Sequence, residues 1–218
     1  MHIGIIPDGN RRWVKENNKT ANDLLNRWKE MLLSRLTNKV VNFTNVEAEG
    51  VEHPEVWEHA KKITEVSAYV VSKDNLRRKD YSLDLIYKFI SFIADLDVIL
   101  DFRINIYGEL NLLPTEVQDN INKIIAKTNS DSTYKLNLAV AYDPITDIKN
   151  FAIDENRSQS QIDMVVRSGR EYRSSGFFPC NTLYSEWHYT DKLWPDMNRN
   201  DFIKAMEYYN SKQRRFGK

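Results

Sequence analysis

Short apolar runs that end in charged turns recur along the chain. The first is Ile3-Gly4-Ile5-Ile6, which leads into Pro7-Asp8-Gly9-Asn10-Arg11-Arg12-Trp13. Such a run predicts a buried strand followed by a turn and the start of a helix. Runs rich in β-branched and aromatic residues predict further strands at 64–71, 103–107, 135–142, 162–167 and 184–189.

Between these runs the apolar residues follow a helical spacing. Leu24, Trp28, Leu32, Leu36 and Val40 repeat every four residues and predict a helix with one apolar stripe. Similar patterns predict helices at 54–62, 83–96, 114–125, 145–152 and 202–209. Strands that alternate with helices favour a parallel sheet covered on both faces. We therefore predict an α/β fold with a six-stranded, mostly parallel sheet flanked by helices.

Composition narrows the class of protein. The chain has 218 residues, which suits a single domain spanning 1–218. Lys+Arg and Asp+Glu are both 31, so no overall positive field favours nucleic acid as a partner. The single cysteine, Cys180, cannot form a disulfide within the chain. No apolar run reaches the roughly 18 residues of a membrane span, so we expect a cytoplasmic protein.

Polar and charged side chains gather where three predicted strands end. They are Asp8 with Asn10 and Arg12, Ser72 with Asn75 and Arg78, and the run Arg167–Ser175. In a parallel sheet these three exits meet along one edge, where ligands commonly bind. Arginines there can hold phosphate oxygens and a carboxylate can hold a hard cation, so the pattern favours a metal-bound diphosphate. Solvated surface turns are the alternative that the residues alone leave open.

Other site motifs are missing from the sequence. It contains neither a GxGxxG motif nor a Walker lysine motif, which disfavours a dinucleotide or ATP site. The histidines at 2, 53, 59 and 188 lack zinc-ligand spacing and do not define a Ser-His-acid triad. We interpret these histidines as structural.

At this point the sequence resembles the cis-prenyltransferases, the family typified by undecaprenyl diphosphate synthase. Three blocks of residues carry the resemblance. The first is His2, Asp8, Gly9, Asn10, Arg12 and Trp13, and the second is Ser72, Asp74, Asn75 and Arg78. The third is Asp163, Arg167, Ser168, Gly169, Glu171, Arg173 and Ser175, then Tyr184, Glu186, Thr190, Asp191, Leu193, Trp194, Pro195, Asp196 and Arg214-Arg215-Phe216-Gly217.

The resemblance implies an enzyme that condenses isopentenyl diphosphate with an allylic diphosphate and forms a Z-polyprenyl diphosphate with Mg²⁺ as cofactor. It implies catalytic roles for Asp8, Asn10 and Asn75, and Mg²⁺ binding by Asp8 and Glu186. The substrate-binding residues that it implies are Gly9, Arg12, Trp13, Ser72, Arg78, Arg167, Arg173, Ser175, Arg215 and Gly217.

The resemblance also bears on assembly and on the lipid product. It implies a homodimer in which the Arg215-x-Gly217 element reaches toward a diphosphate site of the other subunit. The carbocation-like allylic fragment needs a water-poor environment, and the apolar stripes of the helices at 24–40 and 83–96 can line an apolar tunnel for it. Because the product is a lipid, we expect peripheral contact with a membrane.

The chain departs from the family pattern at several positions. The family usually carries a Gly-His pair shortly after the first tryptophan, whereas this chain has Leu24-Leu25-Asn26-Arg27-Trp28. Asp143-Pro144 occupies the place of a Gly-Gly-Arg turn, and Arg170 stands where a second glycine is common. These departures motivate an alternative hypothesis, a non-catalytic partner subunit of a heteromeric cis-prenyltransferase. A different diphosphate or nucleotide ligand at the same edge is a third hypothesis.

Overall fold

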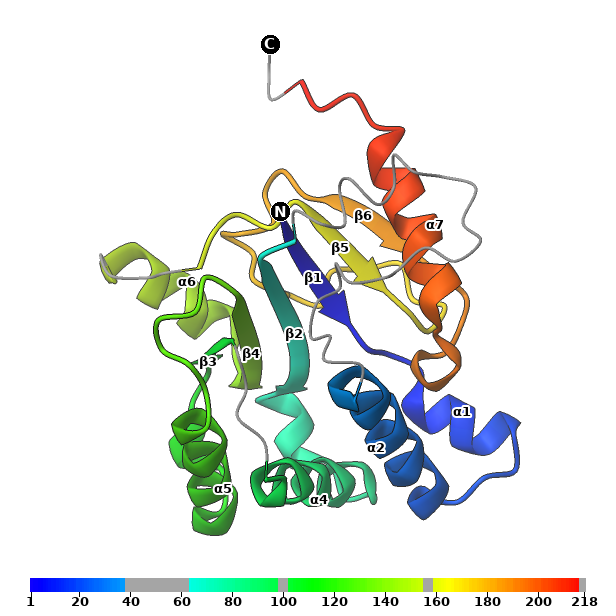
Figure 1. Ribbon diagram of the computed structural model, residues 1–218, viewed down its shortest axis with the longest axis vertical. Coiled ribbons are helices and arrows are strands. Elements are labelled where there is room, and N and C mark those ends of the chain that lie inside the picture. The colour runs from blue at the N-terminus through cyan, green and yellow to red at the C-terminus, as the bar shows by residue number, and fades with distance from the viewer. Residues whose placement is uncertain (38–62, 98–101, 155–158, 216–218) are drawn as a thin grey trace.

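A parallel six-stranded sheet forms the centre of the molecule (Figure 1). The computed structural model describes residues 1–37, 63–97, 102–154 and 159–215. The strands are β1 (His2–Ile6), β2 (Glu65–Ser72), β3 (Arg103–Tyr107), β4 (Lys135–Tyr142), β5 (Met164–Arg167) and β6 (Glu186–Tyr189). Their order is β3-β4-β2-β1-β5-β6, and every pairing is parallel. The predicted α/β fold is confirmed, and the extent of the domain over 1–218 stays a prediction.

Six helices are described around this sheet. They are α1 (Asn10–Glu16), α2 (Ala21–Thr37), α4 (Ser82–Asp95), α5 (Thr115–Ala126), α6 (Pro144–Ile153) and α7 (Arg199–Asn210). Local sequence explains several helix starts: the Asp143 carboxylate caps α6 by accepting from the Ile145 N–H, and Asn198 and Asp201 form a capping box at α7. The predicted helix at 54–62 lies outside the described residues. Each described helix is too short or too polar to span a bilayer.

Helices cover one face of the sheet. Helices α4 and α5 pack on β3 and β4 through a core that includes Ile90, Ile121 and Ile104. Helix α7 packs on β1 and β5, where Met206 meets Ile3. Apolar side chains at alternate positions of the strands supply this face, as expected for a strand buried under helices.

The opposite face is covered by α6 and by the segment between β5 and β6. Phe177 and Phe178 of that segment are fully buried against Ile6, Ala139 and Val165. Gly4 of β1 leaves room for them, because a Cβ there would lie 2.7 Å from a ring carbon of Phe177. The aromatic rings of this irregular segment therefore bury the second face of the sheet, as helices bury the first.

A buried polar network closes the amino edge, the edge of the sheet at which the strands begin. The His2 ring is 2% exposed and lies 2.8 Å from Ser67 Oγ through Nε2 and 3.1 Å from the Ser160 carbonyl through Nδ1. Because a carbonyl only accepts, Nδ1 carries the proton. The Asn137 amide donates to the buried Glu65 carboxylate at 2.7 Å. His2 is thus structural, as the sequence predicts.

Candidate anion-binding site

The ends of β1, β5 and β2 meet at the carboxyl edge, the edge of the sheet at which the strands end. Ile6 pairs with Arg167, and β2 flanks β1 on its other side. The parallel register therefore places the first and third charged exits side by side, with the second exit next to them. This arrangement follows from the topology of the sheet and agrees with the expectation that the exits share one edge.

Asp8 lies at the centre of the charged groups at this edge. Its Oδ1 accepts a hydrogen bond from the Gly9 N–H at 2.6 Å, and its Oδ2 accepts from Arg167 at 2.9 Å. The Arg12 guanidinium is 3.4 Å from Oδ1. The Asp8 side chain is 33% exposed, so the carboxylate is held in place by donors while it still reaches solvent.

Arg167 is the most buried cation of the site, with a side chain that is 3% exposed. Besides Asp8, its guanidinium donates to the Ser175 hydroxyl at 2.7 Å and to the Arg173 carbonyl. Its buried Nε has no hydrogen-bond partner within the described residues. A buried arginine that has more N–H donors than the protein offers acceptors suits a site that binds an oxygen-rich anion.

Glu171 connects two further arginines of the site, although the sequence analysis assigned it no role. Its carboxylate is 3.4 Å from Arg12 and forms an ion pair with Arg173. Arg12, Arg167 and Arg173 thus face Asp8 and Glu171, and this group of charges is positive by one. The excess positive charge attracts anions such as a diphosphate.

Two glycines let the β1 and β5 exits touch through their backbones. Gly9 and Gly169 have φ values of 98° and 95°, a region that L-residues with side chains rarely adopt. A Cβ on Gly169 would lie 2.7 Å from the carbonyl carbon of Asp8. The Ser168 hydroxyl and the Trp194 N–H both donate to the Asp8 carbonyl, at 2.9 Å and 3.0 Å. The backbone that carries Asp8 is therefore fixed from two sides.

The second exit is linked to the third through Tyr69, which the sequence analysis did not single out. Ser72 Oγ accepts from the Asn75 N–H at 3.1 Å and starts the 3₁₀ turn η1 (Asp74–Arg77). The Tyr69 hydroxyl lies 3.4 Å from the Ser175 carbonyl, and burial raises the pKa of Tyr69 to about 12. Tyr69 therefore stays protonated near neutral pH and acts as a hydrogen-bond donor.

Arg78 adds a cation to the same edge. Burial lowers the pKa of its guanidinium, and the neighbouring Arg11 acts in the same direction. The charges of Asp80 and Asp8 act on the pKa of Arg78 in the opposite direction. Arg78 remains charged near neutral pH because the ordinary pKa of arginine is above 12.

Asn10 and Trp13 make contacts inside the protein. The Asn10 amide donates to the Pro7 carbonyl at 2.8 Å and accepts from the Trp28 indole at 3.0 Å. Trp13 is 8% exposed, and its indole N–H donates to Asp196 at 2.8 Å. Trp13 therefore links α1 to the 3₁₀ turn η3 (Trp194–Asp196). This placement favours a packing role over direct contact with substrate.

Two residues that the resemblance assigns to the site lie elsewhere in the chain. Glu186 is the first residue of β6 and pairs with Met164, so it lies about 10 Å along the strands from the level of Arg167. Arg215 follows Arg214, which forms an ion pair of 2.7 Å with Asp163 at the amino edge. The structure does not bring Glu186 or Arg215 to Asp8 of the same chain. Gly217 lies outside the described residues.

The residues around Asp8 fit a Mg²⁺ ion that is shared between one carboxylate and the phosphates of a substrate. Within the described residues no three His, Cys, Asp or Glu side chains gather into a metal-binding group. Mg²⁺ is nevertheless often held by one or two carboxylates together with substrate phosphates and water. A single carboxylate among phosphate-binding arginines matches that second kind of site.

Aromatic side chains of α2 and α4 pack against one another where the two helices meet. Trp28 meets Phe89 edge to face with ring centroids 5.7 Å apart, and Phe89 stacks on Phe92. Leu24 and Leu85 are buried beside them. These contacts form an apolar wall next to the charged group, and the tunnel itself stays a prediction.

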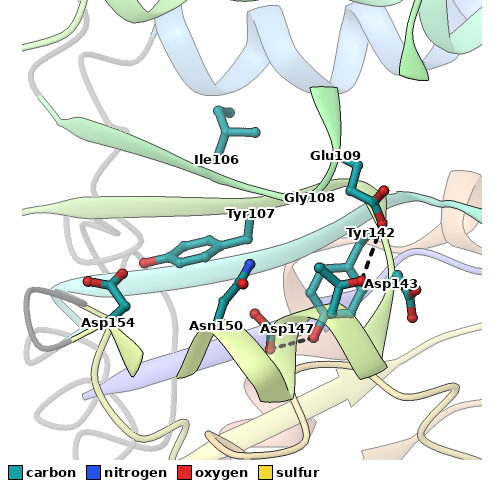
Figure 2. A pocket seen from close by; sticks show the side chains of 10 residues that line it. Ile106, Tyr107, Gly108, Glu109, Tyr142, Asp143, Asp147, Asn150 and Asp154 are labelled. Carbon is teal, nitrogen blue, oxygen red and sulfur yellow. Dashed lines mark hydrogen bonds between the residues drawn. The ribbon is translucent and has the colours of Figure 1, made fainter. Parts of the chain in front are cut away.

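A pocket of about 220 Å³ opens between the ends of β3 and β4 and helix α6 (Figure 2). Its lining includes Glu109, Asp143, Asp147 and Asp154. Figure 2 shows the Tyr142 hydroxyl directed at Asp147, to which it donates at 2.8 Å. None of the predicted site residues lines this pocket, and its acidic lining repels the diphosphates that the arginine group attracts.

Comparison with known proteins gives the family context. The chain matches the prenyltransferase family model described as undecaprenyl diphosphate synthase over residues 45–154 and 146–217. It is 28% identical to isoprenyl transferase 1 of Corynebacterium efficiens, over 100% of this chain and 90% of that protein. It is 29% identical to the geranylgeranyl-diphosphate-specific tritrans,polycis-undecaprenyl-diphosphate synthase of Pyrobaculum aerophilum, over 100% and 95%.

A solved structure extends this similarity to the fold. Lavandulyl diphosphate synthase from Lavandula x intermedia, in complex with dimethylallyl diphosphate, superposes with a TM-score of 0.74 at 21% identity. The superposition covers 100% of this chain and 98% of that one.

Proposed function

Because the chain belongs to the undecaprenyl diphosphate synthase family of prenyltransferases, we propose that it condenses isopentenyl diphosphate with an allylic diphosphate to make a Z-polyprenyl diphosphate. The observation that carries this proposal is the group of Asp8, Arg12, Arg167 and Arg173 at the carboxyl edge. A carboxylate can hold a cation and arginines can hold phosphate oxygens, so this group suits a metal-chelated diphosphate.

The β1 exit and the β5 exit bind different substrates. Asp8, Gly9, Asn10 and Arg12, from the β1 exit, hold the allylic diphosphate. Arg167, Arg173 and Ser175, from the β5 exit, hold the isopentenyl diphosphate. The arginines stabilise the negative charge that develops as the allylic diphosphate leaves, and they do so without reorganising because their contacts fix them beforehand.

The carbon chain of the allylic substrate needs protection from water. The apolar wall of Trp28, Phe89 and Phe92 provides it, and Ser72 and Asn75 lie at the exit that borders the reacting carbons. Mg²⁺ would be held by Asp8 together with the diphosphate and would neutralise charge on the leaving group.

We also propose that the working form is a homodimer. Arg215 and Glu186 lie away from Asp8 of their own chain, so they can serve a diphosphate site only in another copy. Helix α6 supports such an assembly, because Ile145 and Ile148 are 58% and 41% exposed while Asp147 points inward and is 5% exposed. A helix with its apolar side outward is typical of a surface that another chain covers.

An activity assay tests the proposed function. Purified chain, Mg²⁺ and labelled isopentenyl diphosphate are incubated with dimethylallyl, farnesyl or geranylgeranyl diphosphate. We expect extended lipid products from at least one starter, and we expect Asp8→Ala to abolish them while the fold is retained. A chain that makes no product and binds neither substrate would contradict the proposal.

Nothing in the structure favours the alternative of a non-catalytic partner subunit, and activity of the isolated chain would eliminate it.

A further inference from the structure

Trp28 makes a polar contact that its place in an apolar stripe does not predict. Its indole N–H donates to Asn10 Oδ1 at 3.0 Å, although the surrounding residues of α2 form an apolar cluster. The ring is held in that orientation by Phe89 of α4, which meets it at an angle of 62°. The Trp28 ring is half-buried, and the single donor of its indole is directed to an acceptor that belongs to the β1 exit.

The two partners of Asn10 determine how its amide is oriented. An indole N–H only donates and the Pro7 carbonyl only accepts, so Oδ1 must face Trp28 and Nδ2 must face Pro7. The opposite orientation would set two donors against each other and two acceptors against each other. Asn10 follows Asp8 by two residues and begins α1, so its amide belongs to the exit that carries the charged group.

One hydrogen of that NH₂ group is available. In the described part of the chain Nδ2 forms one hydrogen bond, to Pro7, and an amide nitrogen carries two hydrogens. The oxygen, by contrast, is engaged by Trp28. Asn10 is therefore prepared to donate to an anion and is poorly prepared to offer its oxygen to a cation.

We propose that Trp28 is a positioning residue, which fixes Asn10 as a hydrogen-bond donor to the allylic diphosphate. This inference rests on the proposed function for the identity of the ligand. It assigns to Trp28 a role beyond packing, and it distinguishes Asn10, a donor to phosphate oxygen, from Asp8, the ligand of the cation. The same hydrogen bond joins α2 directly to the β1 exit and so helps to fix the position of that exit.

A double-mutant cycle tests the proposal. Trp28→Phe removes the N–H and retains an aromatic ring against Phe89, and Asn10→Ala removes the amide. We expect Trp28→Phe to lower kcat/KM for the allylic diphosphate about tenfold and to leave KM for isopentenyl diphosphate unchanged. We expect the same substitution to cost less than about twofold in the Asn10→Ala background, because the group that it positions is then gone. Trp187→Phe, which removes an indole from the edge strand β6, is the matched control and should leave kcat/KM unchanged.

Several results would overturn the proposal. A Trp28→Phe variant with wild-type kinetics would do so, as would an equal loss in both backgrounds, which indicates packing alone. Thermal melts of all variants separate such effects from loss of folded protein. If the wild-type chain makes no product, the proposed function fails, and calorimetric binding of Mg²⁺ with inorganic pyrophosphate then tests the inference by itself. We expect Trp28→Phe to weaken that binding about tenfold, and unchanged binding would refute the role of Trp28.

Discussion

At the residue scale, the site depends on one guanidinium that contacts three groups at once. Arg167 reaches Asp8, the Ser175 hydroxyl and the Arg173 carbonyl from within the protein. Arg167 reaches these groups through two separate nitrogens, Nη1 and Nη2, whereas a lysine offers all of its donors from one nitrogen. Arg167 therefore sets the geometry of both proposed diphosphate sites as well as supplying charge.

We predict that Arg167→Lys lowers kcat about a hundredfold although the net charge is unchanged. The measurement is steady-state kinetics with both substrates varied. Arg103→Lys is a suitable control, because Arg103 is exposed at the opposite end of the sheet and contacts Asn105. Near-normal kcat in Arg167→Lys would show that charge alone suffices at this position.

Sequence reasoning at this scale found the charged residues but not all of their pairings. Asp8 and Arg167 stand out because each comes directly after an apolar run, and Arg12 because it lies in the charged turn that follows the first of these runs. The bridging role of Glu171 depends on how the 168–175 segment folds back, which no spacing encodes. Trp28 was interpreted as part of a core stripe, because periodicity reports which side of a helix is apolar and says nothing about a single indole N–H.

At the scale of elements, the strands were the most predictable part of the structure. Strands β3 and β4 begin and end at the predicted residues, because β-branched runs bounded by polar turns mark them clearly. Helix α6 was predicted too, but the outward direction of Ile145 and Ile148 was not. That direction follows from the buried Tyr142–Asp147 hydrogen bond, which draws the polar side of the helix toward the sheet.

The amino edge of the sheet makes stability depend on pH. Burial lowers the pKa of His2 from its ordinary value of 6.5, while Glu65 and Asp163 act in the opposite direction. Below about pH 6.5 the unfolded chain therefore binds a proton that the folded chain does not, and stability falls as pH falls toward the folded pKa.

We predict that the free energy of unfolding, measured by urea denaturation, decreases between pH 7.5 and pH 5.5. In a His2→Gln variant the decrease should be smaller, because glutamine does not titrate. His188 also has a pKa lowered by burial, but it is present in both proteins, so the comparison isolates His2. Identical pH profiles for the two proteins would contradict the prediction.

At the scale of the whole molecule, the residues that lie away from Asp8 are the basis of the proposed homodimer. Arg215 follows Arg214 near the amino edge and Asp8 lies at the carboxyl edge, so we expect a second chain to complete the set of residues that the resemblance implies. Helix α6, with its exposed isoleucines, is the surface that we expect a second copy to cover.

We predict that Ile145→Glu combined with Ile148→Glu converts a dimer into a monomer and reduces activity, because charges on a covered apolar surface oppose association. Size-exclusion chromatography with light scattering measures the mass. Leu112→Glu is the control, since Leu112 is 44% exposed on a different part of the surface. A double variant that remains dimeric would place the interface elsewhere.

The central position of β1 in the sheet affects how the chain folds during its synthesis. Ile3 pairs with Val66 on one side and with Met164 on the other, so the first strand to be synthesised receives its second partner only when most of the chain exists. Until then one edge of an apolar strand remains unpaired, a condition that slows folding and promotes aggregation. Co-translational folding can therefore complete the sheet only late, and the Asp8–Arg167 contact can form only when β5 joins β1.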